Sequence, residues 1–230
     1  MSDPAEAIQL VETIGDSADF YKVGMELYAA SGMKLVRELR ALGKSVFLDL
    51  KLYDIGETVK RATRQIATNE GIAFLTVHGS RAVMKAAVDG RNGADIKLLA
   101  VTVLTSFDAE DLADLGYPVP VADLVELRVK KATESGMDGI VCSPLEVGKV
   151  RALAGAEMTI VVPGVRSAGA PAGDQKRVAT PAQALRDGAD HVVIGRQVTR
   201  APDPRGACME ILEEIEDTRE DKRDELDHPA

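Results

Sequence analysis

The sequence predicts a (β/α)₈ barrel of the TIM type, with the first strand absent from its 230 residues. Short runs rich in apolar and β-branched residues alternate with longer helical patterns along the whole chain, as expected for repeated βα units around a parallel sheet. No linker rich in Pro, Gly or Ser interrupts this alternation, and a hydrophobic content of 45% suffices for one large core. A single barrel domain is therefore expected over residues 1–217.

Seven segments have the length and composition of buried strands. In chain order they are residues 20–23, 45–50, 73–78, 97–104, 139–142, 159–162 and 191–194. Helical patterns lie between them, for example at 34–42, 58–69 and 122–135. Two further helices flank the set, at 4–14 before the first strand and at 204–215 after the last. The patterns thus give eight helices and seven strands.

This count bears on the start of the barrel, because a closed (β/α)₈ barrel begins with a strand and ends with a helix. Ser2, Asp3 and Pro4 are typical of the turn and N-cap that open a helix. We therefore expect Met1 to be an internal methionine of a longer natural protein, and an added first strand to raise stability. An open doubly wound sheet is the alternative, but it predicts a GxGxxG turn after its first strand, which the sequence lacks.

Charge and composition exclude several classes of function. Of the net charge of −9, seven units come from the segment between Glu210 and Asp227, so no basic face for nucleic acid is predicted. The charged residues 218–230 are expected to form a disordered tail. There is no apolar run of about 18 residues, no leader pattern and no CxxC pair. We expect a soluble, cytoplasmic protein with neither a membrane partner nor a metal site.

A charged motif ends the second predicted strand. Asp49 and Lys51 are two residues apart, so on a strand they point to the same face, and Asp54 follows in the next loop. Such barrels place their chemistry at the C-terminal ends of the strands. Two carboxylates and an ammonium group there indicate a catalytic site, with a solvated ion pair as the alternative.

The segments after the last two predicted strands are typical of a phosphate site. Residues 162–177 are rich in Gly and Ala and include Arg166, while Gly195 and Arg196 follow the last strand. Many barrels hold a phosphate in these two loops, through backbone N–H groups and a guanidinium fork. A surface loop without a ligand is the alternative for residues 162–177, and the pairing with Gly195 and Arg196 argues against it.

Along nearly its whole length the sequence resembles the orotidine 5'-phosphate decarboxylase family. The DxKxxD motif is shared with related sugar-phosphate barrels, whereas the combination PGxR, GDQKR and GR is specific. The matching stretches are Asp19-Phe-Tyr-Lys-Val-Gly24, Asp49-Leu-Lys-Leu-Tyr-Asp54 with Thr58, Leu75-Thr-Val-His78, Val101-Thr-Val-Leu-Thr-Ser106, Val141-Cys-Ser-Pro144, Pro163-Gly-Val-Arg166, Gly173-Asp-Gln-Lys-Arg177 and Gly195-Arg196.

This resemblance implies a decarboxylase of pyrimidine biosynthesis that uses no cofactor. Lys51 would protonate C6 of the pyrimidine as carbon dioxide leaves, Asp49 would lie beside the departing carboxylate, and Lys22 would contact the ribose. Asp54 and Thr58 would reach into the site of a neighbouring subunit, so the resemblance also implies a homodimer with shared active sites.

The remaining implied contacts are to the two ends of the nucleotide. Thr105 and Ser106 would face the pyrimidine. The residues implied at the 5'-phosphate end are Pro163, Arg166, Gln175, Gly195 and Arg196.

The chain departs from the family pattern in the loop after the DxK motif. Tyr53 replaces a usual histidine, Gly56 a usual proline and Glu57 a usual asparagine, so this loop is expected to be looser and more acidic. The family's first strand, with an aspartate that contacts ribose, is also missing. Two other functions remain open: a metal-dependent sugar-phosphate lyase or synthase of the related barrels, and a catalytically silent nucleotide-binding protein.

Overall fold

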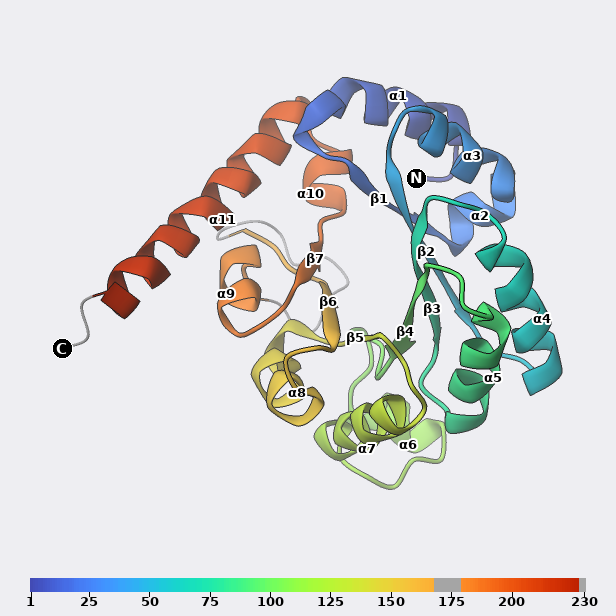
Figure 1. Ribbon diagram of the computed structural model, residues 1–230. Coiled ribbons are helices and arrows are strands. Elements are labelled where there is room, and N and C mark those ends of the chain that lie inside the picture. The colour runs from blue at the N-terminus through green and yellow to red at the C-terminus, as the bar shows by residue number, and fades with distance from the viewer. Residues whose placement is uncertain (168–178, 228–230) are drawn as a thin grey trace.

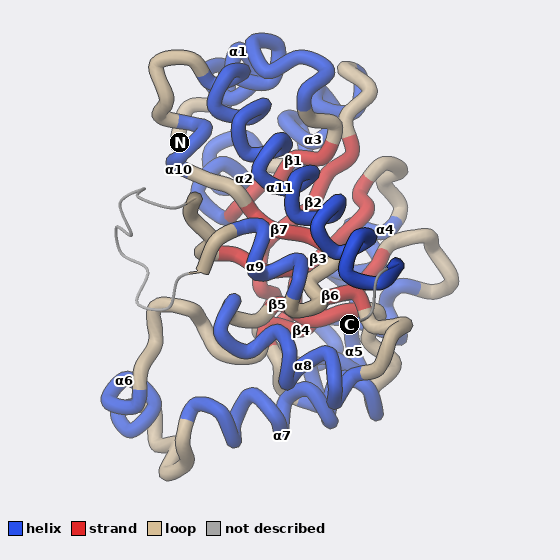
Figure 2. The backbone as a smooth tube through the Cα atoms, turned by 90° about the vertical axis from the view of Figure 1, so that its left-hand side faces the viewer, coloured by secondary structure: helices blue, strands red, loops and turns tan. Residues whose placement is uncertain are grey.

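Parallel strands and helices alternate in the computed structural model, which describes residues 1–167 and 179–227 (Figure 1). Each strand pairs with the next one along the chain, in the order β1-β2-β3-β4-β5-β6-β7. Figure 2 shows the strands at the centre with helices around them. The predicted barrel of seven strands is confirmed. The strands are β1 (Phe20–Gly24), β2 (Ser45–Leu52), β3 (Ile72–His78), β4 (Lys97–Val101), β5 (Gly139–Val141), β6 (Thr159–Pro163) and β7 (His191–Val193).

Two strands end two or more residues away from the predicted positions. Strand β2 continues to Leu52, two residues further than expected. Strand β4 ends at Val101 instead of reaching Leu104, because the chain turns away from β5 there. Thr102 makes the last contact with that strand, through its N–H and hydroxyl to the Val141 carbonyl, and the Phe107 N–H then bonds the Leu104 carbonyl to close a turn.

The helices cover the outside of the sheet (Figure 2). More helices form than the eight patterns indicated, because several connections contain short helices that the sequence periodicity could not reveal. Those in the described residues are α1 (Pro4–Ile14), α2 (Met25–Ser31), α3 (Met33–Ala41), α4 (Gly56–Ala67), α5 (Arg81–Arg91), α6 (Ala109–Asp114), α7 (Val121–Glu134), α8 (Val147–Ala154), α9 (Pro181–Arg186), α10 (Arg196–Thr199) and α11 (Pro204–Asp227), with 3₁₀ turns η1 (Gly15–Ser17) and η2 (Pro144–Glu146).

Helix α11 is longer than the sequence patterns indicated. It was expected to end near residue 215 and to be followed by a disordered tail from 218, yet its backbone is helical through Asp227. The segment 218–227 consists mainly of Glu, Asp, Lys and Arg, without Gly or Pro. Several of these are good helix formers, so the helix continues although the segment has few apolar residues.

The core has two layers. Apolar side chains from the outer faces of the strands pack against the helices, and a second, smaller cluster fills the barrel interior. The buried members of the interior cluster alternate along their strands, as Leu99 and Val101 do in β4. They are Phe47, Phe74, Leu99, Val101, Val141 and Val161. Three of these residues, Phe47, Val101 and Val141, also line the cavity described below.

A seam separates β1 from β7, since no strand ladder joins them within residues 1–167 and 179–227. Side chains cover the seam instead. The rings of Phe20 and His191 meet edge to face across it, with centroids 5.8 Å apart. On the outside, Ile211 of α11 packs with Ile14 and Val198. The start of α11 thereby connects the two ends of the barrel, next to α1 in Figure 1.

Replacing Gly139 with alanine should destabilise the barrel. Gly139 begins β5, and a Cβ there would collide with the Leu99 side chain and the Thr159 carbonyl oxygen. Overpacking of this kind costs about 1–3 kcal/mol, so we expect a clearly lower thermal midpoint. Gly148→Ala in α8 is the matched control, because its Cβ would have no neighbour closer than 4.0 Å. Equal midpoints for the two variants would contradict the close packing at Gly139.

Candidate active site

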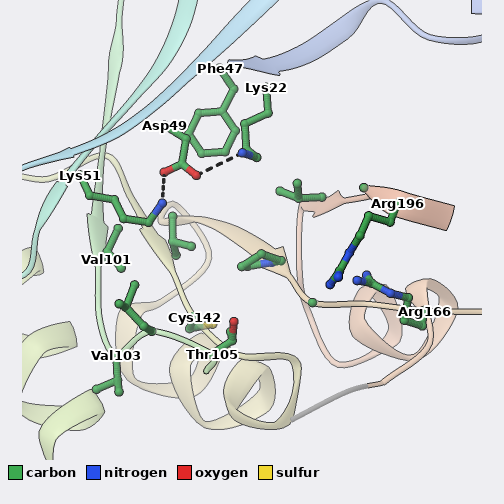
Figure 3. A pocket seen from close by; sticks show the side chains of 16 residues that line it. Lys22, Phe47, Asp49, Lys51, Val101, Val103, Thr105, Cys142, Arg166 and Arg196 are labelled. Atoms are coloured by element: carbon green, nitrogen blue, oxygen red, sulfur yellow. Dashed lines mark hydrogen bonds and ion pairs between the residues drawn. The ribbon is translucent and has the colours of Figure 1, made fainter. Parts of the chain in front are cut away.

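A cavity of about 320 Å³ opens at the C-terminal ends of the strands (Figure 3). Its wall combines charged groups from β1 and β2 with apolar residues from β4, β5 and β7, and with two arginines that follow β6 and β7. The lining residues are Lys22, Phe47, Asp49, Lys51, Val101, Val103, Leu104, Thr105, Val141, Cys142, Pro163, Gly164, Arg166, Val193, Gly195 and Arg196. Asp49 and Lys51 of the predicted charged motif thus lie in one cavity with the two predicted arginines.

Asp49 lies between two lysines. Its Oδ1 accepts a hydrogen bond of 2.7 Å from Lys51 Nζ, and its Oδ2 lies 3.4 Å from Lys22 Nζ (Figure 3). The Asp49 side chain is only 13% exposed, whereas Lys22 and Lys51 are each about one third exposed. The carboxylate is therefore held from both sides, while both ammonium groups remain open to the cavity.

The surroundings of Asp49 keep it ionised. Burial raises the pKa of its carboxyl, but the charges of Lys22 and Lys51 and the hydrogen bonds from Lys51 and Thr76 act in the opposite direction. The pKa consequently lies below its usual value. At neutral pH the site holds a fixed negative charge beside two positive ones.

Arg166 and Arg196 form the other side of the cavity. Figure 3 shows their guanidinium groups next to each other, across the cavity from Asp49. Arg166 is 9% exposed and donates to the Val165 carbonyl at 2.6 Å. Burial and, secondarily, the charge of Arg196 lower the pKa of Arg166. Two like charges held this close favour an anion at this side of the cavity.

The wall between these charged ends is apolar. Val101, Val103, Val141 and Val193 contribute aliphatic surface, and Thr105 adds a hydroxyl group. Sequence analysis missed the valines, although strand alternation contains the signal for one of them. Val101 lies two residues from Leu99 in β4, so it shares the inner face of the barrel.

Cys142 is buried, at 1% exposure, and it lines the cavity directly after β5. Ser106, which was expected to face a pyrimidine with Thr105, is exposed and is not part of the cavity wall. The chain turns after Leu104, which directs these two neighbours differently.

Besides Ser106, three predicted site residues lie outside this cavity or outside the described residues. Asp54 and Thr58 are exposed and do not line the cavity of their own chain. The Asp54 carboxylate instead accepts a hydrogen bond of 2.6 Å from the Ile55 N–H in the loop after β2. Gln175 lies outside the described residues.

The part of the chain that the structure describes contains no group of three His, Cys, Asp or Glu side chains able to bind a metal ion. No helix among those residues is long and apolar enough to cross a membrane.

A barrel with an ion-paired cavity at the C-terminal ends of its strands defines the class: this chain is a (β/α)-barrel enzyme. Residues 1–211 match the family described as "Orotidine 5'-phosphate decarboxylase / HUMPS family". The chain belongs to this family.

Individual relatives agree with this assignment. The chain is 50% identical over 215 residues to orotidine 5'-phosphate decarboxylase of Rhodopseudomonas palustris (strain BisA53), covering 94% of this chain and 91% of the relative. It is 52% identical over 217 residues to the enzyme of the same name from Methylorubrum extorquens (strain PA1), covering 94% and 93%. The crystal structure of orotidine 5'-phosphate decarboxylase from Lactobacillus acidophilus superimposes with a TM-score of 0.82 at 35% identity, covering 94% of this chain and 95% of that one.

Proposed function

We propose that this chain decarboxylates orotidine 5'-monophosphate to uridine 5'-monophosphate in pyrimidine biosynthesis, without a cofactor. The observation that carries the proposal is the arrangement of Asp49 between Lys22 and Lys51 on one side of a cavity with Arg166 and Arg196 on the other. Such a cavity offers a charged reaction centre and an anion site to the same ligand. The two relatives above at 50% and 52% identity carry the name of this activity.

The reaction requires a site that stabilises a carbanion. The bond between C6 and the carboxylate breaks, its electron pair stays on C6, carbon dioxide leaves, and a proton from Lys51 Nζ then bonds to C6. Asp49 repels the substrate carboxylate and is relieved as neutral carbon dioxide forms. The ammonium of Lys51 gains from the negative charge that develops beside it, which stabilises the transition state more than the ground state.

The 5'-phosphate is proposed to bind at the arginines. Arg166 and Arg196 supply the charge, and Gly195, which has no Cβ, allows the phosphate to approach its backbone closely, while Pro163 lines the same cavity. Gln175 is proposed as a further phosphate ligand. Because the phosphate is remote from C6, its binding energy can position the ring for reaction.

The rest of the nucleotide is proposed to span the cavity between these two ends. Lys22 contacts the ribose and completes the charge array around Asp49. Thr105 faces the pyrimidine from the loop after β4, and the aliphatic wall excludes water from the ring. Ser106 is proposed to join them in the substrate complex.

Turnover of orotidine 5'-monophosphate is the direct test. Purified protein should release carbon dioxide and uridine 5'-monophosphate from it in equal amounts, and treatment with a chelator should leave the rate unchanged. Binding of the nucleotide without turnover would favour a catalytically silent binding protein. Turnover of a sugar phosphate that a chelator abolishes would favour the metal-dependent alternative.

We also propose that two copies of the chain form a homodimer in the cytoplasm. The loop after β2 supports the dimer, because it exposes two large apolar side chains, Tyr53 at 68% and Ile55 at 78%. Tyr53 stacks on His78, with ring centroids 4.2 Å apart, so the loop is held in place. Asp54 and Thr58 lie beside these residues and would enter the partner's cavity.

Cys142 and Cys208 are both thiols, as expected in a reducing compartment.

Mixing two inactive variants should restore activity if the sites are shared. In a heterodimer of Lys51→Ala and Asp54→Ala chains, one of the two sites contains both an intact Lys51 and an intact Asp54. Random exchange of subunits should therefore recover roughly a quarter of the parent activity. Each variant exchanged with itself is the control. Absence of recovery after verified subunit exchange, or a monomer by light scattering, would contradict the shared site.

A further inference from the structure

Strand β2 is irregular at the two residues that carry the charge. Leu48 pairs with Leu75 of β3, and the next pair is Leu52 with Val77. Three residues of β2, at positions 49–51, therefore face the single residue Thr76 of β3. Lys51 also has a positive φ of 50°, an uncommon backbone conformation for a residue other than glycine. Such a bulge redirects side chains and leaves backbone groups without a partner in the ladder.

Thr76 supplies the missing partner with its side chain. Its Oγ1 accepts a hydrogen bond of 2.9 Å from the Lys51 N–H and donates one of 2.8 Å to Asp49 Oδ1. The same Asp49 oxygen accepts the bond from Lys51 Nζ at 2.7 Å. The hydroxyl group therefore closes a ring of hydrogen bonds that includes the backbone of Lys51, its ammonium group and the Asp49 carboxylate. Thr76 is fully buried, at 0% exposure, and does not line the cavity.

We propose that Thr76 is a positioning residue, whose hydroxyl holds the Lys51 ammonium and the Asp49 carboxylate in the relative geometry that the proposed decarboxylation requires. The expected effect of Thr76 on the reaction rate rests on the proposed function. The expected effect of Thr76 on the pKa of the Asp49 carboxyl does not depend on that function.

Two consequences follow from loss of the hydroxyl. The buried Lys51 N–H would have no acceptor from Thr76, so the backbone at positive φ would be free to relax and to move the ammonium group. Asp49 would also lose a donor to its charged form. Because a misplacement of about 1 Å in an active site can cost a factor of about 100 in rate, the main effect should fall on kcat.

The test compares Thr76→Val, which removes the hydroxyl at nearly constant shape, with Thr76→Ser, which keeps it. Thr159→Val is the matched control. Thr159 is also a buried strand threonine, its Oγ1 accepts a hydrogen bond of 3.1 Å from Lys97, and it lies at the start of β6, away from the mouth of the cavity. The measurements are kcat for orotidine 5'-monophosphate, the Kd of uridine 5'-monophosphate, the thermal midpoint, and the pKa of the Asp49 carboxyl by carbon NMR.

We expect Thr76→Val to lower kcat by about 10- to 100-fold, with the Kd of uridine 5'-monophosphate within about threefold of the parent. The Asp49 pKa should rise in this variant, because a hydrogen bond to the ionised carboxylate is lost. Thr76→Ser should retain kcat within about threefold and keep the Asp49 pKa low. Thr159→Val should lower the thermal midpoint without changing kcat or the Asp49 pKa.

The inference is overturned if Thr76→Val leaves kcat and the Asp49 pKa at the parent values. It is also overturned if Thr76→Ser is as impaired as Thr76→Val, or if Thr159→Val loses as much kcat for the same change in midpoint. A parent protein that does not turn over orotidine 5'-monophosphate would reject the proposed function instead. The NMR titration would then still decide whether Thr76 holds the carboxylate.

Discussion

Lys51→Ala should lower kcat for orotidine 5'-monophosphate by at least about a thousandfold, which corresponds to roughly 4 kcal/mol of lost transition-state stabilisation. The variant removes the proposed proton donor together with its positive charge from the cavity wall, where Lys51 Nζ lies 2.7 Å from Asp49. The barrel should remain folded, because the Lys51 side chain is 32% exposed and Asp49 keeps its contacts with Lys22 and Thr76.

Lys44→Ala is the matched control for this variant. Lys44 is also partly buried, and its ammonium group donates to the carbonyls of Gly15 and Ala18 at 2.7 and 2.9 Å, away from the cavity. Its loss should reduce the thermal midpoint and spare kcat. If Lys51→Ala stays within about tenfold of the parent, only about 1.4 kcal/mol is lost and Lys51 cannot be the proton donor.

Arg196→Ala should weaken binding of uridine 5'-monophosphate by about 10- to 100-fold, since hydrogen bonds to charged groups contribute about 1.5–3 kcal/mol. Uridine, which has no phosphate, should lose less than about threefold. Isothermal titration of both ligands against parent and variant separates these effects. Arg186→Ala, which alters an exposed arginine bonded to Gln183 on α9, is the control and should change neither affinity. Equal losses for uridine and its phosphate would remove Arg196 from the proposed phosphate site.

Most of the barrel could be predicted because its strands are short apolar segments. Both faces of each strand are buried, one in the barrel interior and one against the helices, so segments such as β6 and β7 differ clearly in composition from the more polar helices. The ends of strands were less predictable. The last contact of the β4 segment with β5 is the bond between the Thr102 hydroxyl and the Val141 carbonyl, which lie 39 positions apart in the sequence.

The site could be predicted from the sequence where the spacing of residues along a strand alone determines the direction of their side chains. Alternation placed Asp49 and Lys51 on one face, and their side chains do meet at 2.7 Å. The route to that contact was not predictable, because β2 reaches it through a bulge and a positive φ at Lys51. The role of Thr76 depends on that bulge, so no pattern in the sequence could have indicated it.

Proximity between distant loops was only partly predictable. The order of strands indicated that Arg166 and Arg196 follow neighbouring strands, and Figure 3 shows them together. The order of strands could not show that Ser106 is exposed while Thr105 lines the cavity. Both residues lie in the turn that the bond from the Phe107 N–H to the Leu104 carbonyl closes, and this turn determines where their side chains point. The roles proposed for Asp54 and Thr58 require a second chain, so they remain predictions.

The seam between β1 and β7 has a consequence for how the chain folds as it is synthesised. Every ladder joins strands that are consecutive in the chain, so pairing can follow synthesis from β1 onward at a small loop-closure cost. The seam differs, since the contact of the Cys208 thiol with the Ser17 carbonyl spans 191 positions. Until α11 emerges, the nascent chain is a curved sheet whose two outer strands are uncovered, the state in which strands of different molecules pair wrongly. Backbone amides of β1 and β7 that point to the seam should therefore gain protection last in pulsed hydrogen exchange, after those bonded within the β1–β2 and β6–β7 ladders.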